Sequence, residues 1–262
     1  MEKVSIIIPA YNEGGRIRKT LKEYAFFFSK IKKEKAVDFE ILVVLNNCKD
    51  NTLEVVEEFI KKNKEILYLN LNRKGKGLAI TEGFKNALTR KNDLIGFVDA
   101  DMATSPEEFY RLIQKIGKYD GAIASRWKGE SIIKTKQPLL RRVLSRGFNF
   151  IVRIFFLFPY TDTQCGAKIF KREVIKNVVN ELNITHWAFD INLLYLCKIK
   201  KFIIKEISTV WEDKKESKIN IKKAPIQMFF GIVRLRILYS PLRSLIKIYD
   251  RFPKKIKFHK ND

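Results

Sequence analysis

The chain has 262 residues, of which 46% are hydrophobic, so it can bury one large α/β core and does not have the composition of a disordered protein. Lysine and arginine number 52 against 29 acidic residues, which gives a formal net charge of +23. Such a charge favours a polyanionic partner: nucleic acid, an anionic membrane surface or a phosphorylated substrate. Charge alone does not choose among these three.

The cysteines and the apolar segments indicate in which compartment the protein is expected and whether it spans a membrane. The three cysteines form no metal-spaced pair and no disulfide framework, which favours a reducing, cytoplasmic compartment. The first apolar run follows Met1-Glu2-Lys3 and ends at Pro9, so it is too short for a signal peptide and is expected to be a buried strand. Arginines interrupt the later apolar stretches 148–159 and 226–242, and we predict no transmembrane helix.

The first half of the chain alternates β-branched runs with longer helical patterns, which is typical of a parallel sheet covered by helices. The predicted strands are 4–8, 39–45, 66–70, 94–99 and 121–125. The predicted helices are 15–32, 52–63, 76–90 and one that starts at Ser105-Pro106. In a Rossmann-like sheet ligands bind beyond the carboxyl ends of the strands. The loops after Ile8, Leu45 and Val98 are therefore expected to line one crevice.

The second half has a less regular pattern. We predict a helix over 138–158, a strand over 167–170, a helix over 188–200, a strand over 203–210 and then C-terminal helices. The simplest organisation is a catalytic domain at 1–222 followed by a basic, amphipathic helical region at 223–262.

Two glycine-containing turns are candidates for binding a nucleotide. In Pro9-Ala10-Tyr11-Asn12-Glu13-Gly14-Gly15, Tyr11 would contact a base and Glu13 a ribose or a stabilising base, although an ordinary strand-to-helix loop explains the turn equally well. Lys74-Gly75-Lys76-Gly77 opens a helix and could offer N–H groups and positive charge to phosphate, or could be a common helix start. The sequence has neither a Walker motif nor a Gly-x-Gly-x-x-Gly fingerprint, which argues against ordinary NTPase or dinucleotide chemistry.

The segment Asp99-Ala100-Asp101 places two carboxylates directly after an apolar strand. Alternation sends both side chains to the same side of the chain, where their charges repel unless a cation lies between them. Mg²⁺ or Mn²⁺, held by one or two carboxylates and completed by substrate phosphate and water, would remove this repulsion. Two acids spaced in this way are also frequent by chance.

Together these motifs resemble family 2 glycosyltransferases of the GT-A fold, over nearly the whole chain. The motifs are Ser5 to Glu13, Asp50-Asn51-Thr52, Lys74-Gly75-Lys76-Gly77 and Asp99-Ala100-Asp101. Three further segments are similar to the branch that makes dolichyl-phosphate glucose or mannose: Ser125-Arg126, Asp162-Thr163-Gln164-Cys165-Gly166-Ala167-Lys168-Ile169-Phe170 and Trp187-Ala188-Phe189-Asp190. The Asp-Thr-Gln-Cys-Gly run is the most specific and favours the dolichyl-phosphate glucosyltransferases.

The resemblance implies a Rossmann-like α/β fold, an inverting hexosyl transfer and a set of donor contacts. Asp99 and Asp101 would hold the diphosphate through the metal, with Asp101 also acting in catalysis. The other donor-binding positions would be Pro9, Tyr11, Glu13, Asn46, Asp50 and Lys76. Two departures stand out: Leu45-Asn46-Asn47-Cys48 replaces the usual Asp-Asp-Gly-Ser, and Ala103 offers no side-chain ligand.

For the acceptor, the resemblance places Asp190 nearby, and a hydroxyl acceptor would use it as general base. A lipid monophosphate needs positioning more than deprotonation, because its second pKa is about 6. Guanidinium groups match phosphate oxygens. The predicted acceptor-phosphate contacts are Arg126, Arg141, Arg142 and Gln164, with Arg126 also assigned a catalytic role and Arg146 as a further candidate. Any one of these arginines could equally be a solvated surface charge.

The predicted function is transfer of glucose or mannose, from UDP-glucose or GDP-mannose, to a polyprenyl phosphate at the cytoplasmic membrane face. Segments 146–158 and 228–239 combine apolar bulk with arginines, as peripheral interfacial helices do. A buried core helix explains the first segment about as well.

Three other functions stay open from the residues alone. One is transfer to a sugar hydroxyl of a glycan or lipid-linked oligosaccharide, and another is a membrane scaffold with an inactive catalytic domain. A nucleic-acid-binding module rests only on net charge, and because no reader motif supports it we expect no nucleic-acid partner.

Overall fold

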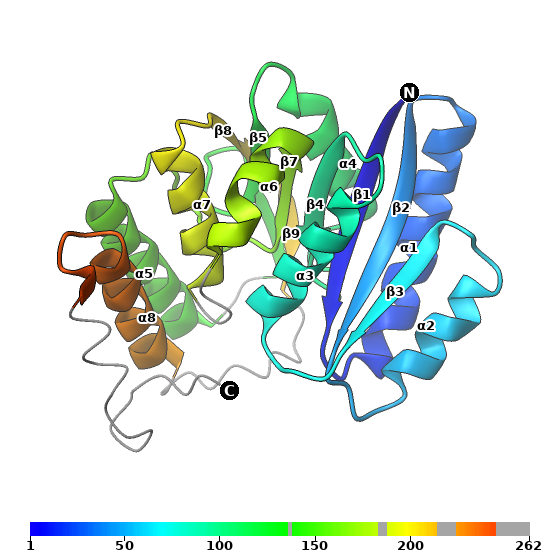
Figure 1. The fold of residues 1–262 in the computed structure, drawn as a ribbon, viewed down its shortest axis with the longest axis horizontal. Coiled ribbons are helices and arrows are strands. Elements are labelled where there is room, and N and C mark those ends of the chain that lie inside the picture. The colour runs from blue at the N-terminus through cyan, green and yellow to red at the C-terminus, as the bar shows by residue number, and fades with distance from the viewer. Residues whose placement is uncertain (136–137, 183–187, 214–223, 245–262) are drawn as a thin grey trace.

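A seven-stranded sheet forms the centre of the computed structural model, which describes residues 1–135, 138–182, 188–213 and 224–244 (Figure 1). Its strands, in order across the sheet, are β3 (Ile66–Leu71), β2 (Val37–Asn46), β1 (Glu2–Ala10), β4 (Leu94–Val98), β7 (Ala167–Lys171), β5 (Gly121–Ser125) and β8 (Ile204–Ser208). Neighbouring strands are parallel except around β7, which runs antiparallel to β4 and β5. The predicted mostly parallel α/β sheet is confirmed.

Helices cover both faces of the sheet, which explains why its strands are near-continuous apolar runs. One face packs against α1 (Gly14–Lys33), α2 (Thr52–Ile60) and α4 (Pro106–Ile116). The other packs against α3 (Lys76–Leu88), α5 (Leu139–Phe156), α6 (Arg172–Val178), α7 (Phe189–Ile199) and α8 (Ala224–Leu238). A 3-10 turn at Val179–Glu181 follows α6. Helix α4 begins as predicted, with the Ser105 side chain accepting from the Glu108 N–H and Pro106 at the first helical position.

The strand predicted over 203–210 is wrong in its extent. Strand β8 ends at Ser208, and β9 (Val210–Glu212) instead pairs with β6 (Ile132–Thr135) in a separate two-stranded sheet. The break occurs because Glu108 accepts hydrogen bonds from the Thr209 hydroxyl (2.9 Å) and the Val210 N–H (3.0 Å). These tertiary contacts turn the chain away from the main sheet.

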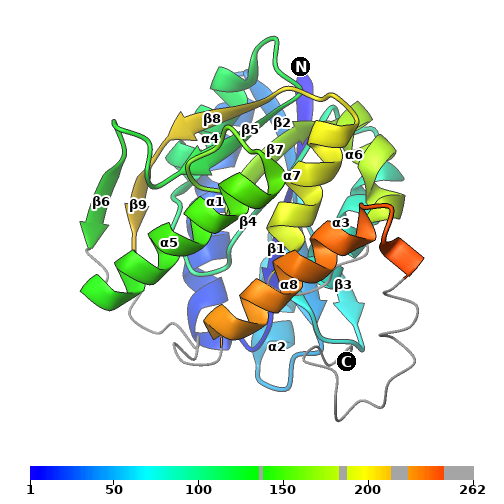
Figure 2. The same ribbon diagram turned by 90° about the vertical axis from the view of Figure 1, so that its left-hand side faces the viewer.

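Helices α5 and α8 lie side by side at one end of the molecule (Figures 1 and 2). On α8, Ile232 and Leu235 are fully buried and join the same apolar cluster as Val152 and Phe156 of α5. Within the described ranges, no helix has both the length and the apolar character needed to cross a bilayer. The domain boundary at 222/223 stays a prediction, because 214–223 and 245–262 lie outside the described residues.

The topology gathers the loops that matter at one edge of the sheet. Parallel β1, β2, β4 and β5 all end there, and antiparallel β7 begins there. The loops after Ala10, Asn46, Val98 and Ser125 therefore meet the segment that enters β7 at Ala167. This edge is where an open α/β sheet binds its ligands.

Candidate active site

The loops after β1 and β2 are bonded together into one wall of the crevice. The Glu13 N–H donates to Thr52 Oγ1 (2.9 Å), and the Gly14 N–H donates to Asp50 Oδ2 (3.1 Å). A Cβ at position 14 would lie 1.9 Å from Asn51 Oδ1, so a side chain there would require the Asn51 side chain to move. The Thr52 N–H also donates to Asp50 Oδ1 (3.1 Å), so the predicted donor contact Asp50 holds the starts of both α1 and α2 in this structure.

The side chains of the first loop lie at this edge with partners of their own. Glu13 accepts two hydrogen bonds from the Arg16 guanidinium (2.7 and 2.9 Å). The Lys74 ammonium lies 5.2 Å from the centroid of the Tyr11 ring, which is 37% exposed. Pro9 is half-buried in β1. Their contact with a nucleoside stays a prediction.

Asn46, the last residue of β2, has a buried side-chain oxygen that lacks a hydrogen-bond partner among the described residues. The residue is 5% exposed. A buried acceptor left unpaired costs about 1–3 kcal/mol. A ligand N–H at the carboxyl end of β2 would remove that cost, which fits the predicted donor-binding position.

The two carboxylates after β4 are crowded, as the sequence predicts. Burial raises the pKa of Asp101, and the negative charge of Asp99 raises that pKa further. The Ala103 N–H donates to Asp101 Oδ1 (2.9 Å), so position 103 contributes through its backbone. Because the charge of Asp99 disfavours the charge of Asp101, the pair is suited to a cation.

Lys76, in the first turn of α3, supplies positive charge to this pair. Its ammonium lies 2.5 Å from Asp99 Oδ1, with side-chain exposures of 45% and 34% respectively. Loss of solvent acts to lower the pKa of Lys76, but the charges of Asp99, Asp190 and Asp101 outweigh it and raise that pKa. Lys76 therefore stays cationic in a crevice that would receive a diphosphate.

The donor set fits a hard divalent ion held partly by substrate. Across the described ranges, no group of three or more His, Cys, Asp or Glu side chains is placed to hold a metal. Mg²⁺ commonly binds through one or two carboxylates plus substrate phosphates and water. Asp99 and Asp101 match that pattern, and the crowding that raises the pKa of Asp101 is the sign of a site that a cation would stabilise.

The segment that enters β7 lies directly against the carboxylate pair. The Asp99 N–H donates to the Gly166 carbonyl (3.1 Å). A Cβ at position 166 would lie 2.0 Å from Asp99 Oδ2, so only glycine permits this approach. The segment 162–166 is thus part of the same crevice as the β4 carboxylates.

A largely buried ion pair holds this segment in place, with the Asp162 side chain fully buried and that of Arg126 12% exposed. The guanidinium of Arg126, after β5, donates to both carboxylate oxygens of Asp162, with Nε–Oδ2 at 2.6 Å and Nη2–Oδ1 at 2.9 Å. Burial acts to raise the pKa of Asp162, but Arg126 and the Gln164 N–H hold it below its usual range. In this structure the predicted phosphate contact Arg126 is engaged by Asp162.

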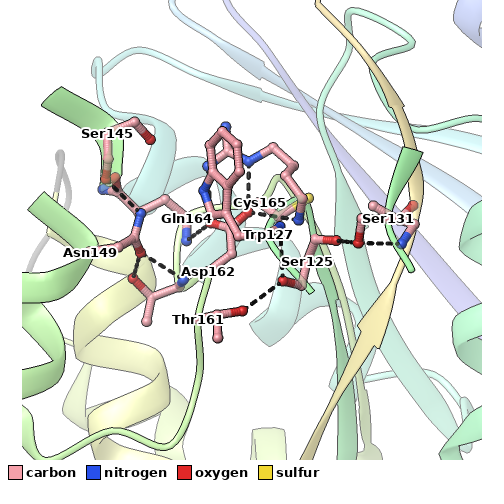
Figure 3. Close-up of polar contacts among 12 residues, drawn as sticks. Ser125, Trp127, Ser131, Ser145, Asn149, Thr161, Asp162, Gln164 and Cys165 are labelled. Atoms are coloured by element: carbon pink, nitrogen blue, oxygen red, sulfur yellow. Dashed lines mark hydrogen bonds and ion pairs between the residues drawn. The ribbon is translucent and has the colours of Figure 1, made fainter. Parts of the chain in front are cut away.

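Further hydrogen bonds fix the same loop (Figure 3). The Thr163 N–H and hydroxyl both donate to Asn149 Oδ1 of α5 (3.0 and 3.1 Å). Glu206 of β8 accepts from the N–H groups of Thr161 and Asp162, each at 2.9 Å. The Thr161 hydroxyl also lies 3.2 Å from the Ser125 hydroxyl. These hydrogen bonds tie the loop to α5, β5 and β8.

Sequence reasoning missed Lys168, which partners Asp190. Lys168 is fully buried in β7, and its ammonium lies 2.5 Å from Asp190 Oδ1 and 2.7 Å from the Cys165 carbonyl. The available signal was a lysine inside the apolar run Ala167-Lys168-Ile169-Phe170, where a charge needs a partner. Asp190 Oδ1 is thus already engaged by a cation, and a general base would have to use Oδ2.

The remaining predicted acceptor contacts are only partly described. Arg142 lies on α5 and is half-buried, and Gln164 is half-buried in the loop before β7. The side chain of Arg141 lies outside the described residues, as do His186, Trp187 and His259. The roles assigned to these positions stay predictions.

Comparison with known proteins identifies the family. Residues 5–179 match the model of "Glycosyl transferase family 2". The chain is 34% identical over 247 residues to a dolichyl-phosphate beta-glucosyltransferase of Dictyostelium discoideum, covering 90% of this chain and 74% of that protein. The corresponding protein of Saccharomyces cerevisiae is 32% identical over 258 residues, covering 90% and 75%.

Solved structures share the fold at low sequence identity. Glucosyl-3-phosphoglycerate synthase of Mycobacterium tuberculosis, solved with Mn²⁺, UDP and glucosyl-3-phosphoglycerate, aligns with a TM-score of 0.64 and 14% identity over 90% of this chain and 80% of that one. Mannosyl-3-phosphoglycerate synthase of Rubrobacter xylanophilus aligns with a TM-score of 0.65 and 14% identity over 98% and 79%. With a family match over most of its length and this GT-A architecture, the chain belongs to glycosyl transferase family 2 and is a glycosyltransferase.

Proposed function

We propose that the protein transfers glucose from UDP-glucose to a polyprenyl phosphate, with inversion at the anomeric carbon. One observation carries the proposal: Gly166 of the Asp162–Gly166 segment packs against Asp99 of the carboxylate pair. The segment typical of dolichyl-phosphate glucosyltransferases is thereby part of the crevice that would hold a nucleotide diphosphate. The named relatives at 34% and 32% identity support the same acceptor class.

The donor half of the crevice suits a uridine diphosphate sugar. Asn46 Oδ1 could accept the imide N–H of uracil, although the ring N–H of guanine would satisfy it as well. The M. tuberculosis synthase structures hold UDP, which supports uracil. A Mg²⁺ or Mn²⁺ ion at Asp99 and Asp101 would neutralise charge on the departing UDP, and Lys76 would donate to its phosphate oxygens.

On the acceptor side, the bond changes need no general base. A phosphate oxygen of the lipid attacks the anomeric carbon, forming a C–O bond while the C–O bond to UDP breaks. The acceptor brings its own negative charge, because a phosphate monoester is largely ionised near neutral pH, with a second pKa of about 6. The engagement of Asp190 by Lys168 at 2.5 Å supports this acceptor, since a hydroxyl acceptor would require a carboxylate ready to take a proton.

We further propose that α5 places the enzyme on the cytoplasmic face of a membrane. Several large apolar side chains of this helix and of the residue that caps it are exposed, namely Leu139 (69%), Phe150 (61%) and Ile154 (56%) on the helix and Leu157 (77%) at its C-cap. Apolar side chains flanked by arginines are typical of interfacial helices. Helix α8 is the weaker candidate of the two segments, because its Ile232 and Leu235 are buried.

Binding to vesicles tests the membrane proposal. Phe150→Ser should weaken binding to phosphatidylserine vesicles by about 10-fold or more in co-sedimentation, because moving the exposed Phe150 side chain from water into the bilayer would contribute about 1.5–3 kcal/mol. Phe26→Ser is the matched control, since Phe26 is 75% exposed but lies on α1. Equal losses in the two variants, or none in either, would contradict this role of α5.

A transfer assay tests the activity. The full chain is incubated with labelled UDP-glucose or GDP-mannose, Mg²⁺ or Mn²⁺, and dolichyl phosphate in detergent. We expect label in the organic phase from UDP-glucose, in a product that mild acid cleaves. If only GDP-mannose labels the lipid, the transferred sugar is mannose and not glucose. An acid-stable product would indicate a hydroxyl acceptor. No labelled lipid from either donor would refute the proposal.

A further inference from the structure

Helix α5 carries three stripes of side chains along its length. With 100° per residue, Asn149, Val152 and Phe156 share the buried stripe, and all are at most 3% exposed. The opposite flank is apolar and exposed, with Val143 (58%), Phe150 (61%) and Ile154 (56%). Between them runs a basic stripe made of Arg142, Arg146 and Arg153. A cationic strip thus separates the loop that Asn149 holds from the proposed bilayer-facing flank.

One arginine of this stripe reaches the active-site edge. The guanidinium carbon of Arg146 lies 4.9 Å from the centroid of the Trp127 ring, in the loop that follows β5. The neighbouring Arg126 also contacts that ring, at 5.6 Å, but its charge is neutralised by Asp162. Among the described residues, Arg146 contacts no carboxylate, and the buried indole N–H of Trp127 has no hydrogen-bond acceptor.

We propose that Arg146 and the Trp127 indole N–H bind the phosphate group of the polyprenyl phosphate. This assignment rests on the proposed function. The stacked ring holds the guanidinium in place, and guanidinium and indole N–H donors suit phosphate oxygens. The lipid chain then leaves along Phe150 and Ile154 into the bilayer. The phosphate is held one helical turn from Asn149, which binds Thr163 of the loop beside Asp99.

Binding of a short acceptor tests this assignment without catalysis. Farnesyl phosphate is titrated by calorimetry into the full chain with Mg²⁺ and UDP, in the absence of vesicles. Arg146→Gln should weaken its binding about 10-fold or more, because charge-assisted hydrogen bonds are lost. Trp127→Phe keeps a ring under the guanidinium but removes the N–H, so it should weaken binding a few-fold. Arg153→Gln, an exposed arginine on the same helix, should bind as the wild type does.

Three further measurements separate the possible sources of an effect. Titrations with farnesol and with inorganic phosphate measure the contributions of the lipid chain and of the phosphate group to binding separately. The affinity for UDP should be unchanged in Arg146→Gln and Trp127→Phe. Vesicles of phosphatidylserine without polyprenyl phosphate should bind Arg146→Gln and Arg153→Gln equally, because each variant loses one positive charge from α5. In the transfer assay, Arg146→Gln should raise KM for the lipid with little change in KM for the donor.

Specific outcomes would overturn the assignment. Unchanged farnesyl phosphate binding by Arg146→Gln and Trp127→Phe would do so, and so would an Arg153→Gln defect of equal size. A loss confined to vesicle binding would make Arg146 a bilayer contact instead. If the wild type transfers glucose, and Arg146→Gln and Trp127→Phe bind farnesyl phosphate as it does, only this assignment is rejected. If the wild type transfers no sugar but still binds farnesyl phosphate through Arg146, only the proposed reaction is rejected.

Discussion

The two halves of the crevice use charge in opposite ways. On the proposed donor half, at the ends of β1, β2 and β4, the Lys76 and Asp99 side chains are 45% and 34% exposed. Asp99 also raises the pKa of Asp101 by repulsion. On the proposed acceptor half, around β5 and β7, the Asp162 and Lys168 side chains are fully buried, and each has an oppositely charged partner at 2.5–2.6 Å.

This difference distinguishes residues that are available to bind a ligand from residues that stabilise the fold around the crevice. An exposed ion pair contributes little to stability, about 0–1 kcal/mol, and can exchange its partner. Breaking a buried pair leaves an uncompensated charge and costs about 3–5 kcal/mol. Donor-half substitutions should therefore reduce activity while the fold persists, and acceptor-half substitutions should reduce stability first.

The largest effect on stability is expected from Asp162→Asn. The change leaves the Arg126 guanidinium buried without a counter-charge, so the free energy of unfolding should fall by about 3–5 kcal/mol in a urea titration. Glu58→Gln breaks the exposed Arg18–Glu58 pair and serves as control, with an expected cost within about 1 kcal/mol. Similar losses in the free energy of unfolding for the two variants would contradict the distinction between the buried and the exposed ion pairs.

The same variant predicts a pH dependence. The pKa of Asp162 is lower in the folded chain than its ordinary value of about 3.9, so its stabilisation is present above that value and is lost as the pH falls through the folded pKa. The stability gap between wild type and Asp162→Asn should be full at pH 7 and should narrow below about pH 4. A gap that stays constant with pH would show that the charge of Asp162 is not its source.

The largest effect on activity is expected from Asp101→Asn. Loss of one carboxylate from the diphosphate site should lower kcat by about 10²–10³-fold, similar to the loss of one group that stabilises a transition state. The melting temperature without metal should be unchanged or higher, because burial and Asp99 disfavour the charge of Asp101. The rise in Tm caused by Mn²⁺ and UDP should disappear.

The control for that substitution is Glu34→Gln, an exposed carboxylate just after α1. It should keep both the activity and the Tm rise. A large fall in the stability of Asp101→Asn without ligand would mean that the proposed donor half also stabilises the fold.

A double-mutant cycle on Lys168 and Asp190 sharpens the comparison. Lys168→Met and Asp190→Asn should each destabilise the fold, but the double variant should lose less than their sum, with a coupling of about 0.5–3 kcal/mol. Activity should not return in the double variant, because Asp190 also contributes to the field at Lys76. Additive stability losses would show that the pair is not a structural unit.

The smallest effect is expected from Asn46→Ala. The variant should bind UDP about 2- to 12-fold more weakly, the range of one hydrogen bond of about 0.5–1.5 kcal/mol. Its stability without ligand should not fall by the cost of a lost hydrogen bond, since the Asn46 oxygen has no partner among the described residues. Unchanged UDP affinity would remove Asn46 from the donor site.

Local patterns were sufficient to predict most of the fold and to place the proposed donor-site carboxylates at one edge of the sheet. The apolar run Ile6-Ile7-Ile8 predicts a strand buried on both faces, and Ser105-Pro106 predicts the start of α4. Asp99 and Asp101 follow β4 directly, so parallel-strand topology alone places them at the binding edge. These features depend on neighbours in sequence, which is why periodicity and capping reveal them.

Only the tertiary structure decided the acceptor half. Arg126 meets Asp162 across 36 residues, and Lys168 meets Asp190 across 22 residues, because antiparallel β7 inserts between β4 and β5. Glu108 likewise ends β8 from about 100 residues away, by binding Thr209 and Val210. No local propensity encodes such pairs: a buried charge takes whichever partner the packed sheet brings within reach.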